Sequence, residues 1–178
     1  MASHRRAWAR SITAAALLSG LSAAAMADDS LCPGLAQALQ APPGSGDREV
    51  FFSNYTRHWS PSEAHHRVHA VSLRQGLVDR NFCGMSLFTN SFGQPSLYVF
   101  VGKTFPDIVP SIPKLFASVS AGLLYGYTYP YENKVPLNFH GFSPAVVPTL
   151  GYQLTPDIAL ETQWLGFAAV MVGASWRY

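Results

Sequence analysis

Few side chains of this sequence are of the kind that carries out chemistry, and they fall in two places. The first holds His58 and a cluster of three more histidines, His65, His66 and His69, and the second is the pair Asn90-Ser91. Histidine exchanges a proton near neutral pH, and a serine beside such a base is a common nucleophile in acyl transfer. The two places lie far apart in the sequence, so only the fold can bring them together.

The histidine cluster has two further interpretations. His65, His66 and His69 compete with His58 for the role of base, and three histidines within five residues also suggest a metal site. On an extended strand only alternate residues share a face, which disfavours His65 and His69 as a ligand set. We therefore predict no metal and no cofactor.

The last twelve residues, Phe167–Tyr178, indicate what kind of element holds these side chains. One face of this segment carries Ala168, Val170, Val172, Ala174, Trp176 and Tyr178, and the chain ends on an aromatic residue. About 9–11 residues of such alternation, with an aromatic near the interface, are typical of a strand that faces lipid. The segment therefore predicts a transmembrane β-strand.

The amino-terminus predicts export. Arg5, Arg6 and Arg10 precede an apolar stretch from Ile12 to Ala25, and small residues end it before Asp28, which is typical of a cleaved signal peptide over residues 1–27. Cleavage leaves 178 − 27 = 151 residues with 9 Lys and Arg against 10 Asp and Glu, so the formal net charge changes from +2 to −1. The basicity of the precursor therefore indicates no nucleic-acid partner.

The composition points to a closed barrel. The chain is 48% hydrophobic and 12% charged, yet after the signal peptide it has no uninterrupted apolar run long enough for a spanning helix. Because the bilayer offers no partner to an unpaired backbone amide, strands cross it only in closed barrels. We predict an all-β fold, an eight-stranded antiparallel transmembrane β-barrel over residues 48–178, in the outer membrane of a Gram-negative bacterium. A leader over residues 28–47 precedes it, with a short amphipathic helix.

Eight segments have the composition of barrel strands. They are Val50–His58, His66–Gly76, Phe82–Asn90, Ser96–Lys103, Leu115–Tyr125, Phe142–Tyr152, Asp157–Leu165 and Phe167–Tyr178. In the seventh segment Glu161 falls on the lumen face, where Arg177 of the last strand could pair with it. The fourth segment is apolar on both faces, so part of the lumen is predicted to be apolar, as a packed plug or as a slot for an acyl chain.

The two cysteines, Cys32 and Cys83, leave two possibilities open. In an oxidising compartment a disulfide between them could tie the leader to the barrel. The strand register places Cys83 on the lipid face, which argues instead for a free thiol.

The topology brings the candidate residues to one end of the barrel. With both termini periplasmic, odd-numbered strands run outward and even-numbered strands run inward. The first strand then carries His58 to the outer rim, and the third carries Asn90 and Ser91 to the same rim. The long connection over residues 126–141 adds further polar groups there. The potentially catalytic groups are therefore predicted to meet at the outer leaflet.

Pro144 and Pro148 interrupt the sixth segment. Proline donates no ladder hydrogen bond, so the pairing of this strand with a neighbour must be broken near them. Either the strand bends at a bulge, or the barrel has a lateral gap through which a lipid tail enters.

Together these residues resemble the lipid A palmitoyltransferase family, outer-membrane barrels that move a palmitoyl chain from a phospholipid to lipid A. Residues 145–166 resemble the family's proline-broken sixth strand, its Gly-Tyr turn and its seventh strand, and Val135-Pro136-Leu137 resembles the end of its long outer loop. His58 and Ser91 match the family's histidine and rim serine. Asn90 stands where the family has an acidic residue.

The resemblance implies a monomeric acyltransferase with a phospholipid donor and a lipid A acceptor, needing no cofactor and no nucleic acid. In that mechanism His58 accepts a proton or polarises the ester, and Ser91 attacks or hydrogen-bonds the carbonyl. Asn90, being an amide, would steady the oxyanion rather than orient a histidine. The depth of the apolar slot would select the acyl chain.

Other functions stay open. In a structural, adhesive or lipid-binding barrel, Asn90 and Ser91 form an ordinary turn, His58 lies at headgroup level, and the lumen is packed by Phe88, Phe100 and Leu124. A lipid A deacylase or phospholipase would use the same rim but admit water. A pore is the least favoured, because the barrel is narrow and the lumen carries few charges.

Overall fold

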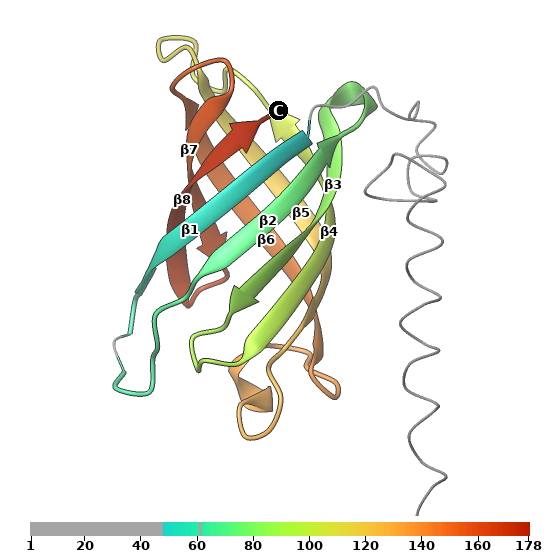
Figure 1. Ribbon diagram of the computed structural model, residues 1–178, viewed down its shortest axis with the longest axis vertical. Coiled ribbons are helices and arrows are strands. Elements are labelled where there is room, and N and C mark those ends of the chain that lie inside the picture. The colour runs from blue at the N-terminus through green and yellow to red at the C-terminus, as the bar shows by residue number, and fades with distance from the viewer. Residues whose placement is uncertain (1–47, 61) are drawn as a thin grey trace, which may run out of the picture.

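The chain forms a closed barrel of eight antiparallel strands, each paired with its neighbours in sequence order and the last with the first (Figure 1). This computed structural model describes residues 48–60 and 62–178. The strands are β1 (Arg48–His58), β2 (Ala70–Gly76), β3 (Asn81–Thr89), β4 (Pro95–Phe105), β5 (Leu115–Tyr125), β6 (Phe142–Gln153), β7 (Ile158–Leu165) and β8 (Ala169–Arg177), with 3₁₀ turns η1 (Val78–Arg80) and η2 (Glu132–Lys134) in the connections. The predicted signal peptide, residues 1–27, and the predicted leader helix, within residues 28–47, lie outside the described residues.

All eight predicted strands are present, so the prediction of an eight-stranded barrel is confirmed. The largest difference in boundaries is at β2, which begins at Ala70 rather than at His66. The segment before β2, which holds the histidine cluster, lies beside the β3–β4 turn and not beside β1. The backbone N–H of His66 there donates to the Ser91 carbonyl at 2.8 Å. The histidine cluster therefore belongs to a connection, and the strand-face argument does not apply to it.

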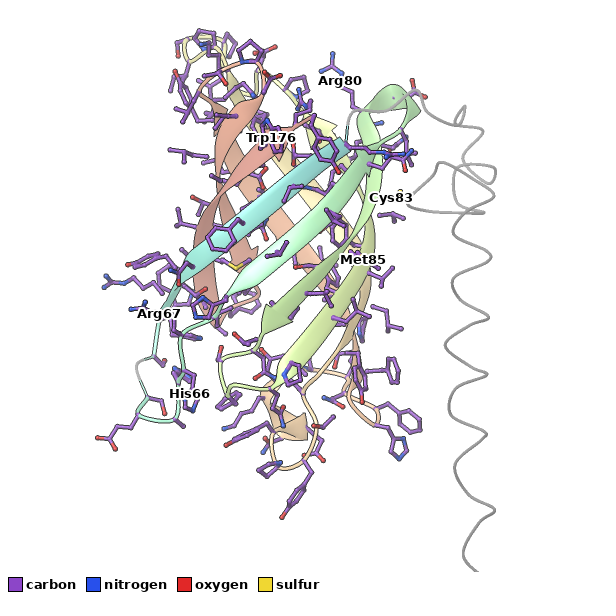
Figure 2. All side chains as sticks on the ribbon, viewed as in Figure 1. His66, Arg67, Arg80, Cys83, Met85 and Trp176 are labelled. Atoms are coloured by element: carbon purple, nitrogen blue, oxygen red, sulfur yellow. The ribbon has the colours of Figure 1, made fainter. Side chains whose placement is uncertain are left out.

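The outside of the barrel is an apolar belt. Alternate residues point away from the lumen, and Figure 2 shows Cys83 and Met85 of β3 and Trp176 of β8 on this outward face. The exposed hydrophobic residues of the strands include Phe52, Val71, Leu87, Val99, Leu123, Val146, Leu160 and Trp176. A closed barrel with such a belt fits the hydrocarbon of a bilayer, so the chain is an outer-membrane-type transmembrane barrel, as predicted. Among the described residues, no helix is long and apolar enough to cross a membrane.

The two ends of the barrel differ. The described chain starts and ends at the same end, where the N–H of Tyr178 donates to the Arg48 carbonyl at 2.8 Å. We call the opposite end, which carries the β1–β2, β3–β4, β5–β6 and β7–β8 connections, the outer rim (Figure 1). His58, Asn90 and Ser91 all lie at the outer rim, as the topology predicts.

The strand ladder is interrupted on one side of the sixth strand. β6 pairs with β5 from Phe142 to Tyr152, but it pairs with β7 only from Thr149 to Gln153. Residues 142–148, which include Pro144 and Pro148, therefore have no partner on the β7 side. We call this opening the β6–β7 gap, and it corresponds to the lateral gap that the two prolines suggest.

A second interruption lies beside the first strand. β1 pairs with β2 only from Arg48 to Ser53, whereas it pairs with β8 as far as His58. The outer part of β1, from Asn54 to His58, therefore has a free edge on its β2 side. No feature of the sequence indicates this β1–β2 gap, because no proline marks it.

A cluster of charged side chains lies in the lumen, toward the end of the barrel that holds the described termini. Glu161 of β7 is 1% exposed, and the Arg74 guanidinium on β2 donates to its Oε1 at 2.5 Å. Arg74 also pairs with Glu49 of β1, and Arg177 lies 3.8 Å from the same carboxylate. The prediction that Glu161 faces the lumen is correct, but Arg74 on β2, rather than Arg177 on the neighbouring strand, pairs with it. Two cations and two anions together neutralise the cluster.

The structure contradicts the expectation that Cys83 is a free thiol. Its side chain points outward from β3, as the register predicts, but it is 1% exposed and disulfide-bonded rather than a free thiol. The only other cysteine in the sequence, Cys32, lies outside the described residues.

Replacing Arg74 with methionine should destabilise the barrel, because it leaves buried Glu161 without its partner. Breaking a buried ion pair from one side costs about 3–5 kcal/mol. Urea unfolding of the protein in lipid, followed by tryptophan fluorescence, measures this, with Lys103→Gln on the exposed periplasmic side of β4 as the control. The double variant Arg74→Met/Glu161→Gln should recover part of the loss. An Arg74→Met protein as stable as the control would contradict the assignment.

Candidate active site

A β-bulge in β1 directs His58 into the barrel. The ladder with β8 runs from Glu49 to Ser53, skips Asn54, and resumes at Tyr55. The Ser53 hydroxyl holds the bulge by donating to the Val172 carbonyl at 2.7 Å. Because the bulge absorbs one residue, His58 lies opposite Ala169, a buried residue on the lumen face of β8. With strict alternation from Ser53, His58 would face lipid.

His58 and Ser91 meet at the outer rim. The distance between His58 Nε2 and Ser91 Oγ is 2.6 Å, although His58 ends β1 and Ser91 lies in the β3–β4 connection. With the ring proton on Nδ1, the Ser91 hydroxyl donates to Nε2, which is the arrangement that a general base requires.

Ser91 is held from two further sides. Its carbonyl accepts the backbone N–H of His66 at 2.8 Å, and its hydroxyl is hydrogen-bonded to the side chain of Tyr127 from the β5–β6 connection. Burial raises the pKa of the Tyr127 hydroxyl above its usual value, and the hydrogen bond to Ser91 opposes this rise. The Tyr127 hydroxyl is therefore neutral at neutral pH.

Asn90 does not face the His58–Ser91 pair. It is 1% exposed, and its Oδ1 accepts the backbone N–H groups of Phe92 and Gln94, each at 3.0 Å. Its Nδ2 donates to Gln94 Oε1 at 3.2 Å and to the Gly126 carbonyl at 3.1 Å. All the hydrogen-bonding capacity of the amide is thus used to fold the β3–β4 turn and join it to the β5–β6 connection, and none is left for an oxyanion.

The remaining histidines have different surroundings. His65 stacks on His58 with ring centroids 4.1 Å apart and meets the edge of Phe92 at 5.6 Å, while His66 and His69 are exposed. Phe92 in turn stacks on Tyr131 at 4.3 Å. These rings join three of the outer connections. In the part of the chain that the structure describes, no group of three His, Cys, Asp or Glu side chains is suited to a metal ion.

A cavity of about 660 Å³ runs from Ser91 and Tyr127 down the lumen to Arg74. Its apolar lining includes Val68, Phe88, Leu124, Leu165 and Met171, and its hydroxyl lining includes Ser72, Ser86, Ser118, Ser120 and Thr149. Tyr98 and Phe100 stack on each other at 4.9 Å and narrow the lumen from β4. Phe100 lies across Gly84, where a Cβ would come within 2.9 Å of its ring. The lumen is thus an apolar slot with a polar floor.

The cavity also reaches the side of the barrel. Pro144 and Val146 of β6 and the β7–β8 connection at residues 166–168 line it, so its wall includes the β6–β7 gap. Lys134 lies at its mouth, 5.6 Å from the centre of the Phe92 ring. An apolar tail inside this cavity would have its polar end beside Ser91 and a cation nearby.

Sequence reasoning identified two of these groups and missed a third. His58 and Ser91 come together as predicted from the topology. Asn90 precedes Ser91 in sequence, but its side chain is hydrogen-bonded within the β3–β4 turn. Tyr127 was one of several polar residues in a long connection. It alternates with Tyr125 and Tyr129, and nothing in the sequence sets it apart from them.

The fold and this rim define a small transmembrane β-barrel with a polar pair above an enclosed slot. No protein-family model matches the chain. No curated protein matches it either.

Comparison with solved structures finds small β-barrels that are similar to this chain to different degrees. A structure from the de novo design of transmembrane β-barrels is 17% identical with a TM-score of 0.52, and the match covers 75% of this chain and 96% of that one. The Yersinia pestis outer membrane protein Ail in a phospholipid bilayer nanodisc is 12% identical with a TM-score of 0.48, over 75% and 99%. The N-terminal β-barrel domain of Pseudomonas aeruginosa OprF is 17% identical with a TM-score of 0.41, over 75% and 96%. The likeness to the designed barrel concerns the fold alone.

Replacing Asn90 with aspartate should destabilise the outer rim rather than improve the site. A carboxylate oxygen would face Gln94 Oε1 and the Gly126 carbonyl, which are both acceptors, so we expect a loss of about 1–3 kcal/mol in the free energy of unfolding. Asn133→Asp in the exposed η2 turn is the control. If the aspartate variant were as stable as wild type and more active in any lipid assay, Asn90 would instead stand in for an acidic partner of His58.

Proposed function

We propose that this protein is an outer-membrane acyltransferase that moves a fatty acyl chain from a phospholipid to a hydroxyl of lipid A. The observation that carries the proposal is the 2.6 Å contact between His58 Nε2 and Ser91 Oγ at the mouth of the 660 Å³ lumen cavity. A base, a nucleophile and an apolar slot in one place are what acyl transfer from a lipid requires. The sequence resemblance to lipid A palmitoyltransferases supports the same function.

The donor enters from the bilayer through the β6–β7 gap. The cavity wall already includes Pro144 and Val146, so an acyl chain passes from the outer leaflet into the lumen without crossing a paired ladder. The tail then lies among apolar side chains, and its ester is at the level of Ser91. Lys134 lies where it would meet the donor phosphate.

Transfer takes place in two steps, acylation of Ser91 and then transfer of the acyl chain to the acceptor. Ser91 Oγ attacks the ester carbonyl while His58 Nε2 takes the hydroxyl proton. His58 then gives this proton to the leaving lysophospholipid oxygen, and the acyl chain stays on Ser91. The acceptor hydroxyl then attacks this ester, gives its proton to His58, and Ser91 leaves with that proton. Tyr127, whose hydroxyl already contacts Ser91, is the donor for the developing oxyanion in place of Asn90.

The lumen selects the acyl chain and limits hydrolysis. Tyr98 and Phe100 narrow the slot, and the Arg74 cluster forms its floor. An acyl chain with too many methylenes would have to displace these side chains. One methylene in an apolar pocket is worth about 1–3 kcal/mol, so the slot favours a narrow range of chain lengths.

A non-catalytic lipid-binding barrel is the second candidate. The observation in its favour is that, within residues 48–60 and 62–178, His58 has a serine and a stacked histidine as neighbours but no ion pair with a carboxylate. In enzymes that transfer acyl groups, a carboxylate commonly orients the catalytic histidine. In that case the cavity would hold a lipid tail without reacting with it.

Lipid A from an outer membrane that lacks its own acyltransferase tests the proposal. Wild-type protein should add the mass of one acyl chain, and His58→Ala and Ser91→Ala should abolish the addition. Tyr127→Phe should lower the rate about 10²–10³-fold, as expected for loss of one oxyanion donor. His69→Ala, an exposed histidine away from the slot, serves as the control. A loss of an acyl chain would indicate a deacylase, and no change with a folded barrel would favour the lipid-binding barrel.

A further inference from the structure

The His58 imidazole needs a contact that fixes the plane of its ring. Within residues 48–60 and 62–178, the Ser91 hydroxyl makes the one side-chain hydrogen bond to this ring, at Nε2. One hydrogen bond leaves an imidazole free to tilt about its Cβ–Cγ bond. His58 is also the last residue of β1, whose outer part is paired on its β8 side alone. Strand ends with few partners open most readily, so another element must hold the ring.

His65 makes this contact. Its ring lies against the His58 ring, with centroids 4.1 Å apart and planes tilted by 31°. It also meets the Phe92 ring at 5.6 Å with the planes at 71°, and Phe92 stacks on Tyr131 at 4.3 Å. Aromatic rings favour stacked and edge-to-face arrangements of this kind, so each ring limits the rotation of its neighbour. We call these four residues the ring stack, and they come from β1 and from the β1–β2, β3–β4 and β5–β6 connections.

The ring stack and the nucleophile share one anchor. The backbone N–H of His66, which Figure 2 labels in the β1–β2 connection, donates to the Ser91 carbonyl at 2.8 Å. The backbone N–H of His65 donates to the Ser62 carbonyl at 3.0 Å and closes the turn that holds its ring. The chain at His65 is therefore tied directly to the chain at Ser91. This tie sets the position of the His65 ring, and with it that of the His58 ring, relative to the serine.

His65 is the member of the histidine cluster that fits this task. His66 and His69 are exposed, whereas His65 is half-buried against the base. Its Nδ1 is shielded from solvent and makes no hydrogen bond with the described residues. The contacts of the His65 side chain are thus those of its ring, and an aromatic ring without nitrogen atoms would make them equally well.

We propose that His65 is a positioning residue for the catalytic base, and that its ring holds the His58 imidazole in the plane that directs Nε2 at Ser91. This inference rests on the proposed acyl transfer and adds to it the group that orients the base. In other acyl-transfer enzymes a carboxylate has this task. Here the residue before the serine is Asn90, whose amide is used within and beside the β3–β4 turn. The ring stack orients the base in place of that carboxylate, without adding a negative charge.

Kinetics with the full mature protein in lipid vesicles test the role of His65, with a phospholipid carrying a labelled acyl chain as donor and lipid A as acceptor. His65→Leu removes the ring, so kcat should fall about 10–100-fold, as expected when a base is slightly misplaced. KM for the phospholipid should stay unchanged, because His65 does not line the lumen cavity. His65→Phe restores a ring and should return kcat to within about threefold of wild type. His69→Leu, at an exposed histidine of the same connection, should behave as wild type.

Three kinetic results would overturn the inference. A wild-type kcat in His65→Leu would show that the ring does not position the base. An equal loss in His65→Phe would assign the effect to the nitrogen atoms of His65, and a raised KM with unchanged kcat would assign it to substrate binding. Heat-dependent migration on a gel reports whether each barrel is folded. If His65→Leu does not fold, Tyr131→Leu at the far end of the ring stack should still lower kcat about two- to fivefold at constant KM, and an unchanged kcat there would count against the stack.

An NMR measurement separates the role of His65 from catalysis. In wild-type protein with ¹⁵N-labelled histidine, the His58 ring should show one tautomer, with its proton on Nδ1, and a nuclear Overhauser contact with the His65 ring. His65→Leu should average the two tautomers of His58, and His65→Phe should restore the single one. A single tautomer in His65→Leu would refute the positioning role whatever the activity. The expected pattern in a wild type that transfers no acyl chain would leave the ring stack standing and refute the acyltransferase instead.

Discussion

Every backbone amide of a strand within a bilayer must find its partner inside the protein, and this constraint organises the whole molecule. It forces the eight strands into a closed ladder and leaves the apolar side chains to face lipid. It also makes each interruption of the ladder costly, so the two that exist are informative. One lies beside residues 142–148, where the prolines have no N–H to satisfy, and the other beside the outer part of β1. Both lie at the outer half of the barrel, on either side of the polar rim.

Much of this architecture follows from the sequence, because alternation and turn chemistry are local. The eight strands, the outward face of β8, the lumenal position of Glu161 and the arrival of His58 and Ser91 at one rim all come from period-two patterns and chain direction. Contacts across the lumen do not. The pairing of Arg74 with Glu161 joins β2 to β7, and the tilt of the strands that brings them together leaves no mark in either segment. The disulfide at Cys83 likewise leaves no mark in the alternation of β3.

The sequence predicts which residues reach the rim, but not what each of their side chains contacts. Asn90 precedes Ser91 in sequence, yet neighbouring residues in a turn point in different directions. The Asn90 amide makes three hydrogen bonds within the turn and a fourth to the Gly126 carbonyl. Those bonds explain why an amide suits this position, since a carboxylate could not donate to Gln94 or Gly126. Tyr127 reaches Ser91 from a long connection whose path no periodic pattern describes. A rim assembled from four connections is therefore found only with the fold in hand.

Because the bulge at Asn54 absorbs one residue, the length of the first strand and the direction of its histidine are linked. In a relative that lacks this residue, the corresponding strand would need no bulge and its histidine would still face the lumen. In a relative of equal length without the bulge, the histidine would face lipid. First strands descended from a common ancestor are thus free to differ by a single insertion or deletion here without loss of the base. An alignment that forbids gaps within strands would then pair His58 with the wrong residue.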